Sequence, residues 1–151
     1  MKIEILAVAI LGVAAIGAQG AALSQTAGSS SGARSARTGV YSEAQQKRGE
    51  VIYSRECSTC HGERLKGGEG APALAGSDFS AGWNGRTVGD LFDRITQTMP
   101  APPEQPGKLT PQQTADVVAH ILSVNSFPAG TVELTFEIDP LKRIRIDAPK
   151  P

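Results

Sequence analysis

The chain is poor in metal-binding residues and has no excess of charge. Its 151 residues include two cysteines and two histidines, and 15 basic side chains are balanced by 15 acidic ones. Nucleic-acid binding would call for a basic patch or stripe, and nothing in this balance suggests one. A tetrahedral zinc site needs four ligands with a second close pair, which the isolated His120 cannot supply.

Long hydrophobic runs are also missing. The apolar run from Ile5 to Ala18 is shorter than the roughly 20 residues that a membrane span requires. It follows Met1-Lys2 and precedes small residues, an order that is typical of a secretory signal peptide. We therefore expect a cleaved signal peptide over residues 1–22. An uncleaved membrane anchor is the alternative, because residues 3–22 approach spanning length.

Both cysteines stand in the motif Cys57-Ser-Thr-Cys60-His61. The C-x-x-C-H spacing is typical of covalent haem attachment, in which the thiols form thioethers with the haem vinyls and the imidazole reaches the iron from one face. A thioredoxin-like dithiol would sit beside a βαβ pattern, whereas a Gly- and Pro-rich loop and then a helix follow here. The motif therefore predicts one haem c, bound through Cys57 and Cys60. It also favours the periplasm, since c-type haem is attached outside the cytoplasm.

Composition divides the rest of the chain into three parts. Residues 23–40 are rich in Ser, Gly and Ala without an apolar period, so we expect a flexible leader. Residues 41–127 suffice for one small haem domain. Residues 128–151 are expected to form an extended C-terminal tail, in which 132–138 alternate as in a β-strand. A hairpin and a looser wrap around the domain both remain open, as do a docking strap for a partner and a cover for the domain's own core.

Helix start signals predict three helices within the haem domain. One runs from Ser42 into Cys57, and a second begins near Thr87. A third runs over residues 110–124, where a capping Thr precedes Pro. Between the first two, residues 62–74 predict a loop around the cofactor. The side chains expected to face the core are Ala44, Val51 and Ile52, then Leu91, Phe92 and Ile95, then Val117, Val118, Ile121 and Leu122.

The second face of the iron could be filled by Met99, by His120, by an external ligand or by nothing. Met99 is the strongest candidate, since it lies far downstream of His61 in a proline-rich loop. A soft thioether raises the reduction potential, which suits electron transfer. His120 is expected on the third helix as a surface or packing histidine.

Taken together, these elements resemble class I c-type cytochromes over residues 41–127. The shared features are a helix before C-x-x-C-H, a Gly-rich loop with Pro, a lone Trp, Met-Pro and a C-terminal helix. The resemblance implies an all-α fold of three to five short helices around one covalently bound haem, with an extended tail. It implies haem attachment at Cys57 and Cys60, with iron bound by His61 and Met99.

The resemblance also implies a set of residues around the haem. The Pro72 carbonyl should accept the Nδ1 proton of His61, which leaves Nε2 for the iron. Trp83 could donate to a haem propionate, although ordinary core packing is the competing interpretation. The remaining pocket residues that it implies are Leu74, Phe92 and Leu109.

More narrowly, residues 39–53 and 116–130 and the basic tail resemble small cytochromes that serve periplasmic quinoprotein-type dehydrogenases. His120 departs from this pattern, since many relatives prefer an aromatic residue there. The implied function is transfer of single electrons from a periplasmic dehydrogenase to a downstream cytochrome or oxidase, without a catalytic residue. A haem subunit of an enzyme complex is one alternative, and a haem enzyme or gas-binding protein with a labile sixth ligand is another.

Overall fold

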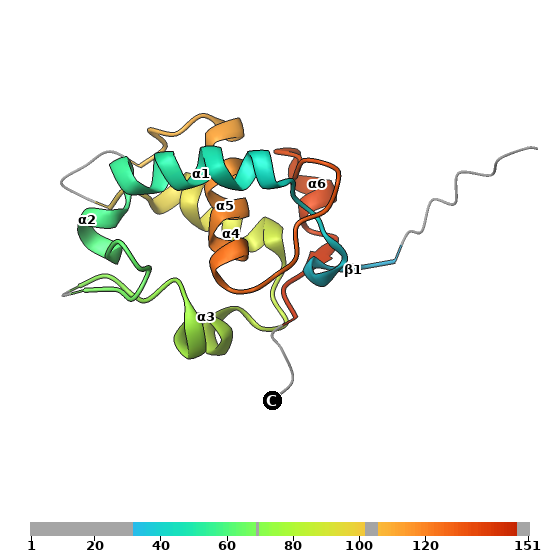
Figure 1. Cartoon of the computed structure of the whole chain (residues 1–151), viewed down its shortest axis with the longest axis horizontal. Helices are drawn as coiled ribbons and strands as arrows, with labels where there is room; N and C mark the ends of the chain where they lie inside the picture. Colours follow the sequence, from blue (N-terminus) through green and yellow to red (C-terminus); the bar gives the residue numbers. More distant parts are fainter. Residues whose placement is uncertain (1–31, 69, 102–105, 148–151) are drawn as a thin grey trace, which may run out of the picture. The chain divides into compact units, whose positions relative to one another are not determined.

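The computed structural model describes residues 32–68, 70–101 and 106–147. The predicted signal peptide over 1–22, and the leader as far as residue 31, lie outside these ranges. Within them the fold is helical, with one sheet of two short strands (Figure 1). No helix in the described ranges is long and apolar enough to cross a membrane. The elements are β1 (Arg34–Ser35), the 3-10 helix η1 (Ala36–Thr38), α1 (Glu43–Glu56), α2 (Ser58–His61), α3 (Gly76–Trp83), α4 (Val88–Thr98), α5 (Pro111–Val124), α6 (Ile138–Leu141) and β2 (Ile144–Arg145).

The three predicted helices are α1, α4 and α5, and each begins where its capping residue indicates. The Ser42 hydroxyl accepts a hydrogen bond from the Gln45 N–H at 3.1 Å, which satisfies a backbone donor that the helix leaves open. The other two helices begin with complete capping boxes, Thr87 with Asp90 and Thr110 with Gln113. The predicted all-α fold is therefore confirmed in these elements.

The helices α1 and α5 cross in close contact at Gly49. A Cβ atom at this position would lie 1.8 Å from the carbonyl oxygen of Asp116 and 3.1 Å from the Cβ of His120. Both partners belong to α5, and the oxygen is backbone, which cannot swing aside. Only a hydrogen atom fits at the crossing, so Gly49 sets how closely the two central helices approach.

The predicted core face of α1 is partly wrong. Ile52 is buried, but Ala44 is exposed and Val51 is 65% exposed. The buried face instead runs through Gln45 and Gly49 to Ile52 and Tyr53. Gly49 lies on this face because α5 approaches too closely there for any side chain, and Gln45 lies on it because its amide bonds to the tail.

Of the two arrangements left open for the tail, the structure shows the looser wrap around the domain and no hairpin in the described residues. Residues 132–137 contain no strand, although Leu134 is buried while Val132 and Phe136 are exposed. The short strand β2 pairs instead with β1, in parallel, with Arg34 opposite Ile144. The alternating pattern thus reflects the burial of a single side chain, Leu134, and not hydrogen bonding between β-strands.

The end of the expected leader belongs to the folded domain. Residues 34–38 form β1 and η1, and Ala36 and Val40 are buried. This segment meets the tail where Gly130 donates to the Tyr41 carbonyl at 2.7 Å. A Cβ on Gly130 would lie 2.2 Å from the Gly39 oxygen, so the two segments pack backbone against backbone. Composition alone predicts a flexible leader here, because the tail segment that orders residues 34–40 lies about ninety residues away in the chain.

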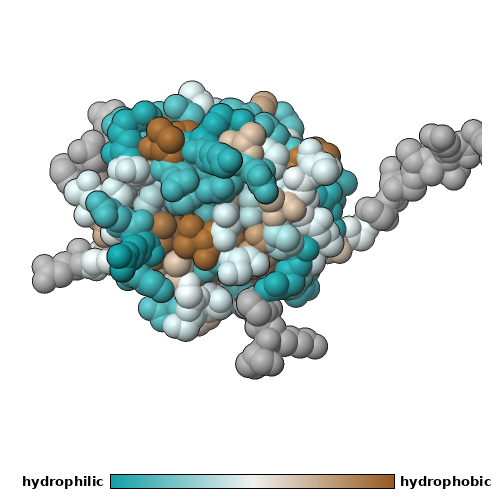
Figure 2. All heavy atoms as spheres, viewed as in Figure 1, coloured by the Kyte–Doolittle hydropathy of each residue, from teal (hydrophilic) through white to brown (hydrophobic). Residues whose placement is uncertain are grey.

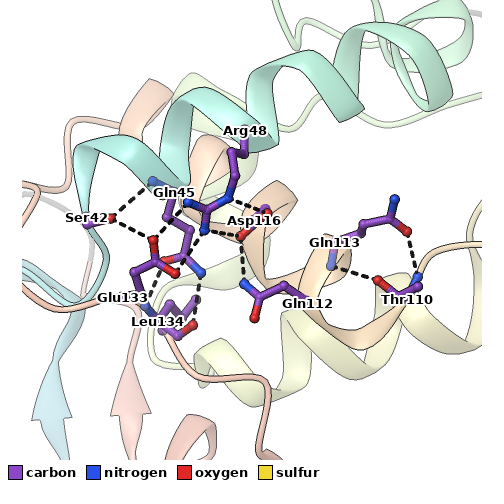
Figure 3. Close-up of polar contacts among 9 residues, drawn as sticks. All are labelled: Ser42, Gln45, Arg48, Thr110, Gln112, Gln113, Asp116, Glu133 and Leu134. Atoms are coloured by element: carbon purple, nitrogen blue, oxygen red, sulfur yellow. Dashed lines mark hydrogen bonds and ion pairs between the residues drawn. The ribbon is translucent and has the colours of Figure 1, made fainter.

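Polar side chains fasten the tail to the first half of α1 (Figure 3). The Gln45 amide donates to the Leu134 carbonyl at 2.9 Å and accepts from the Leu134 N–H at 2.7 Å. The Arg48 guanidinium contacts both carboxylate oxygens of Asp116 and both of Glu133. These contacts lie toward the N-terminal end of α1, whereas the C-x-x-C-H motif follows its C-terminal end (Figure 1).

Replacing Gln45 by methionine is expected to destabilise the domain by about 2 kcal/mol, because it preserves volume but leaves the buried N–H and C=O of Leu134 without partners. Chemical denaturation measures the free energy of unfolding. The matched control is Gln46→Met one residue along, where only an exposed bond to Glu50 is lost. Equal effects of the two substitutions would contradict the anchoring role of Gln45.

Candidate haem site

The C-x-x-C-H motif lies on its own short helix at the C-terminal end of α1. Cys57 lies between the two helices: its N–H donates to the Tyr53 carbonyl at 2.9 Å and caps the end of α1, and the same residue caps the start of α2. His61 closes α2 through a backbone bond to the Cys57 carbonyl at 3.0 Å. Both cysteines are free; Cys57 is half-buried and Cys60 is exposed. The helix therefore carries all three motif side chains within about one turn and a half.

The imidazole of His61 is held by one hydrogen bond. Its Nδ1 lies 2.8 Å from the Pro72 carbonyl oxygen, and the side chain is largely buried. A carbonyl oxygen only accepts, so the proton of the neutral ring sits on Nδ1. Nε2 then keeps its lone pair, as an imidazole that binds a metal requires.

The loop after α2 brings Pro72 back to His61 through a series of backbone bonds. Gly67 donates to the His61 carbonyl at 2.8 Å, and Leu74 donates to the Leu65 carbonyl at 2.8 Å. These bonds fold residues 62–74 back against α2. The loop predicted from glycine and proline content is present, and it contains no helix or strand in its described residues.

Asn125 holds the far end of this loop, a contact that sequence analysis missed. Its amide donates to the carbonyls of Leu74 and Ile121, both at 2.8 Å, and its oxygen accepts from the Gly76 N–H at 3.0 Å. The sequence gives little warning of this contact, because Asn125 directly follows α5 without the left-handed backbone in which asparagine commonly ends a helix. Asn125 thereby fixes the loop carrying Pro72 to the end of α5.

Most of the expected haem-pocket residues share one property. Their apolar side chains are partly buried and pack against the core without being enclosed by it. Figure 2 shows hydrophobic residues at the surface between α1 and α3 on the face in view. Phe92 differs, since it is a buried core residue, and Pro72 contributes its carbonyl from an exposed position. The partly buried members are Cys57, Leu74, Trp83, Met99 and Leu109.

Met99 lies directly after the last residue of α4. Its N–H donates to the Ile95 carbonyl at 3.0 Å, and its carbonyl accepts from the Gly107 N–H at 3.3 Å. These bonds place Met99 at the start of a loop that returns to Gly107. Residues 102–105 of that proline-rich loop lie outside the described ranges.

Trp83 packs against neighbours on two sides. Its ring stacks on Phe79 with centroids 6.2 Å apart, and the Arg86 guanidinium lies 5.5 Å from its ring centroid. This packing accounts for its apolar surface. The predicted propionate contact of the indole is a separate property and stays a prediction.

His120 lies inside the α1–α5 interface. It is buried, its ring centroid is 5.3 Å from that of Tyr53, and its Nδ1 has no hydrogen-bond partner in the described structure. Burial lowers the pKa of His120, and the nearby Glu50 opposes this shift. The position matches the packing role expected from the sequence.

The His120 pKa leads to a testable pH dependence. Since folding lowers this pKa, the unfolded chain binds the extra proton, so stability is full above the unfolded value of about 6.5 and falls as the pH drops. Denaturation between about pH 7.5 and about 5.5 should show a smaller loss for His120→Phe than for the parent. If the parent and His120→Phe lose the same free energy of unfolding over this pH range, His120 is not the source of the pH dependence.

The donor set fits a covalently bound haem. Burial raises the pKa of the Cys57 thiol to about 11, with smaller contributions from Glu56 and Cys60. An uncharged sulfur therefore suits this half-buried position, and a thioether is uncharged. Among the residues described, no three His, Cys, Asp or Glu side chains gather as a metal centre would require. A haem attached through both sulfurs and bound through Nε2 of His61 would use the Cys57 sulfur as an uncharged thioether and the His61 ring in its Nδ1-protonated form.

Comparison with known proteins identifies a family and similar solved structures. The family described as cytochrome C oxidase, cbb3-type, subunit III matches residues 44–121. The crystal structure of the sulfane dehydrogenase SoxCD from Paracoccus pantotrophus is similar at 22% identity with a TM-score of 0.50, over 66% of this chain and 52% of that one. The chain thus spans about half the length of that protein, and the likeness concerns the fold alone. No curated protein matches the chain.

Proposed function

Because the chain belongs to the family of cytochrome c oxidase, cbb3-type, subunit III, and is a haem electron-transfer protein, we propose that it relays single electrons between periplasmic redox proteins. The observation at the site that best supports this proposal is the 2.8 Å contact between His61 Nδ1 and the Pro72 carbonyl, because it leaves Nε2 available to bind iron. Localisation to the periplasm rests on the predicted signal peptide and on where haem c is attached.

In this proposal each residue of the site has one task. Cys57 and Cys60 bind a single haem c, whose iron supplies one-electron chemistry. His61 would bind the iron through Nε2, while the Pro72 carbonyl holds the ring in its orientation. Met99 would supply a second ligand, and its thioether would favour the reduced state. No side chain acts as a catalytic acid, base or nucleophile.

We propose a periplasmic dehydrogenase as the electron donor and a cytochrome or oxidase as the acceptor. The similar solved structure is itself a sulfane dehydrogenase, so sulfur compounds are the first substrates to test. The chain carries no net charge, which gives little long-range steering. We therefore expect docking to depend on apolar surface around the haem edge.

Affinity capture of tagged, haem-loaded protein from its own periplasmic extract tests this proposal, with haem reduction followed on adding sulfur, alcohol or aldehyde substrates. One dehydrogenase retained in fixed ratio, reducing the haem on substrate addition, would identify the chain as the haem subunit of that complex. Reduction by several unrelated donors without retention would identify a mobile carrier. A haem that no periplasmic dehydrogenase reduces would contradict the proposal.

A further inference from the structure

A charged contact ties the loop after Met99 to the end of α1. The Lys108 ammonium lies 2.8 Å from one carboxylate oxygen of Glu56, and the Arg55 guanidinium lies 2.6 Å from the other. Both oxygens of Glu56 therefore have a cationic partner. The Glu56 side chain is only 11% exposed, whereas that of Lys108 is 52% exposed.

The contact closes a short path between the two sides of the haem site. Glu56 directly precedes Cys57, the first expected attachment point. Lys108 directly follows Gly107, whose N–H donates to the Met99 carbonyl at 3.3 Å. One ion pair and one hydrogen bond thus connect the segment that carries the attachment cysteine with the residue expected to bind iron from the opposite face.

The partly buried side chain of Glu56 distinguishes this pair from an ion pair between two fully exposed residues. Exposed pairs contribute little, because water screens both charges and long side chains lose freedom. Here the Glu56 side chain is partly buried and each of its oxygens has a cationic partner, so removing Lys108 leaves the carboxylate with a single partner, the adjacent Arg55 on its own helix. The loop loses its side-chain attachment to α1 in the same step.

We propose that Lys108 and Glu56 are positioning residues for Met99. They hold the loop after α4 against the haem-attachment segment and so slow the release of the thioether from the iron. The inference rests on the proposed role of Met99 and adds a reason for the sixth position to stay closed to small ligands. Neither residue is proposed as an iron ligand.

The test compares three variants of the full, haem-loaded chain. Lys108→Gln and Glu56→Gln each break the pair. Of the two substitutions, Lys108→Gln should disturb the fold less, because its side chain is the more exposed one. Asp93→Asn is the matched control, since it breaks the pair with Lys142 between α4 and the residue after α6. Two readouts report on Met99, namely the far-red sulfur-to-iron charge-transfer band of the oxidised protein and the rate at which the reduced protein binds carbon monoxide.

Each variant that breaks the pair should bind carbon monoxide about tenfold faster than the parent, equivalent to about 1.4 kcal/mol. The Asp93→Asn control should match the parent. The double variant should be no faster than the faster single one, because both substitutions remove the same contact. Salt at about 1 M should accelerate binding in the parent and leave the double variant unchanged.

Two different results would overturn the proposal. If the parent shows the far-red band while Lys108→Gln and Glu56→Gln behave like Asp93→Asn, Met99 binds iron without help from the ion pair. If the parent lacks the band and binds carbon monoxide at once, the proposed role of Met99 fails, and the positioning role fails with it. The parent spectrum separates the two cases.

Discussion

Replacing Met99 by alanine should turn a low-spin haem that ignores carbon monoxide near neutral pH into a high-spin haem that binds it. Alanine has no donor atom, and among the described residues no three His, Cys, Asp or Glu side chains gather as a metal site. Loss of the thioether also removes its preference for reduced iron, so the reduction potential should fall by on the order of 0.1–0.3 V, within the roughly 0.8 V range that axial ligands cover. Absorption spectra with and without carbon monoxide, followed by redox titration, measure both effects.

His120→Ala is the matched comparison, because His120 is the other candidate ligand in the sequence. Its burial between α1 and α5 predicts lower stability for this variant but an unchanged low-spin spectrum. The reverse pattern, with low-spin character lost in His120→Ala and kept in Met99→Ala, would overturn the ligand assignment. A carbon monoxide-sensitive parent would instead favour an enzyme or gas-binding protein with an open sixth site.

Replacing Gly49 by alanine should destabilise the domain by about 3 kcal/mol and lower its melting temperature by about 10 °C. The new methyl group would lie 1.8 Å from the Asp116 carbonyl oxygen, so α1 and α5 must separate to admit it. Helix propensity works in the opposite direction, since alanine favours a helix over glycine by about 1 kcal/mol. The steric cost is expected to exceed this gain. Thermal and chemical denaturation of the haem-loaded protein measure the difference.

Gly82→Ala is the control for that substitution. Gly82 also lies in a helix, α3, but a Cβ there meets no atom within 4 Å. Its replacement should leave stability unchanged or raise it by up to about 1 kcal/mol. A Gly49→Ala variant as stable as Gly82→Ala would show that the helices do not approach as closely as the structure indicates.

The helices that the sequence predicts well are those whose start signals are local. Ser42, Thr87 and Thr110 each bond to a backbone N–H three residues ahead, so sequence spacing alone identifies them. The C-x-x-C-H motif is equally local, since its chemistry depends on five consecutive residues. By contrast α3 follows Ala75, which offers no capping side chain, and no signal announced this helix.

Features that depend on distant partners could not be predicted in the same way. The buried face of α1 follows from the close approach of α5 at Gly49 and from the bonds between Gln45 and Leu134. The strand β2 finds its partner in β1, at the other end of the domain, and not in the neighbouring tail. Alternation in a sequence indicates which side chains are buried, but it does not name the surface that buries them.

The candidate site shows the same division. The residue types and spacing at Cys57, Cys60 and His61 predict the cofactor, whereas the contacts that support the site come from elsewhere in the chain. Asn125 holds the loop of Pro72, and Lys108 reaches Glu56, each across about fifty residues. Nothing in the sequence alone pairs these residues, because the pairing depends on how α1, α4 and α5 pack.

The central claim is that the chain binds one haem covalently through Cys57 and Cys60. Intact mass spectrometry under denaturing conditions tests it most directly, on protein produced with a cytochrome c maturation system and compared with Cys57→Ser/Cys60→Ser. We predict a mass equal to the mature chain plus one haem, and the chain alone for the double variant. A parent chain that carries no haem after denaturation, with two thiols free to react, would contradict the account.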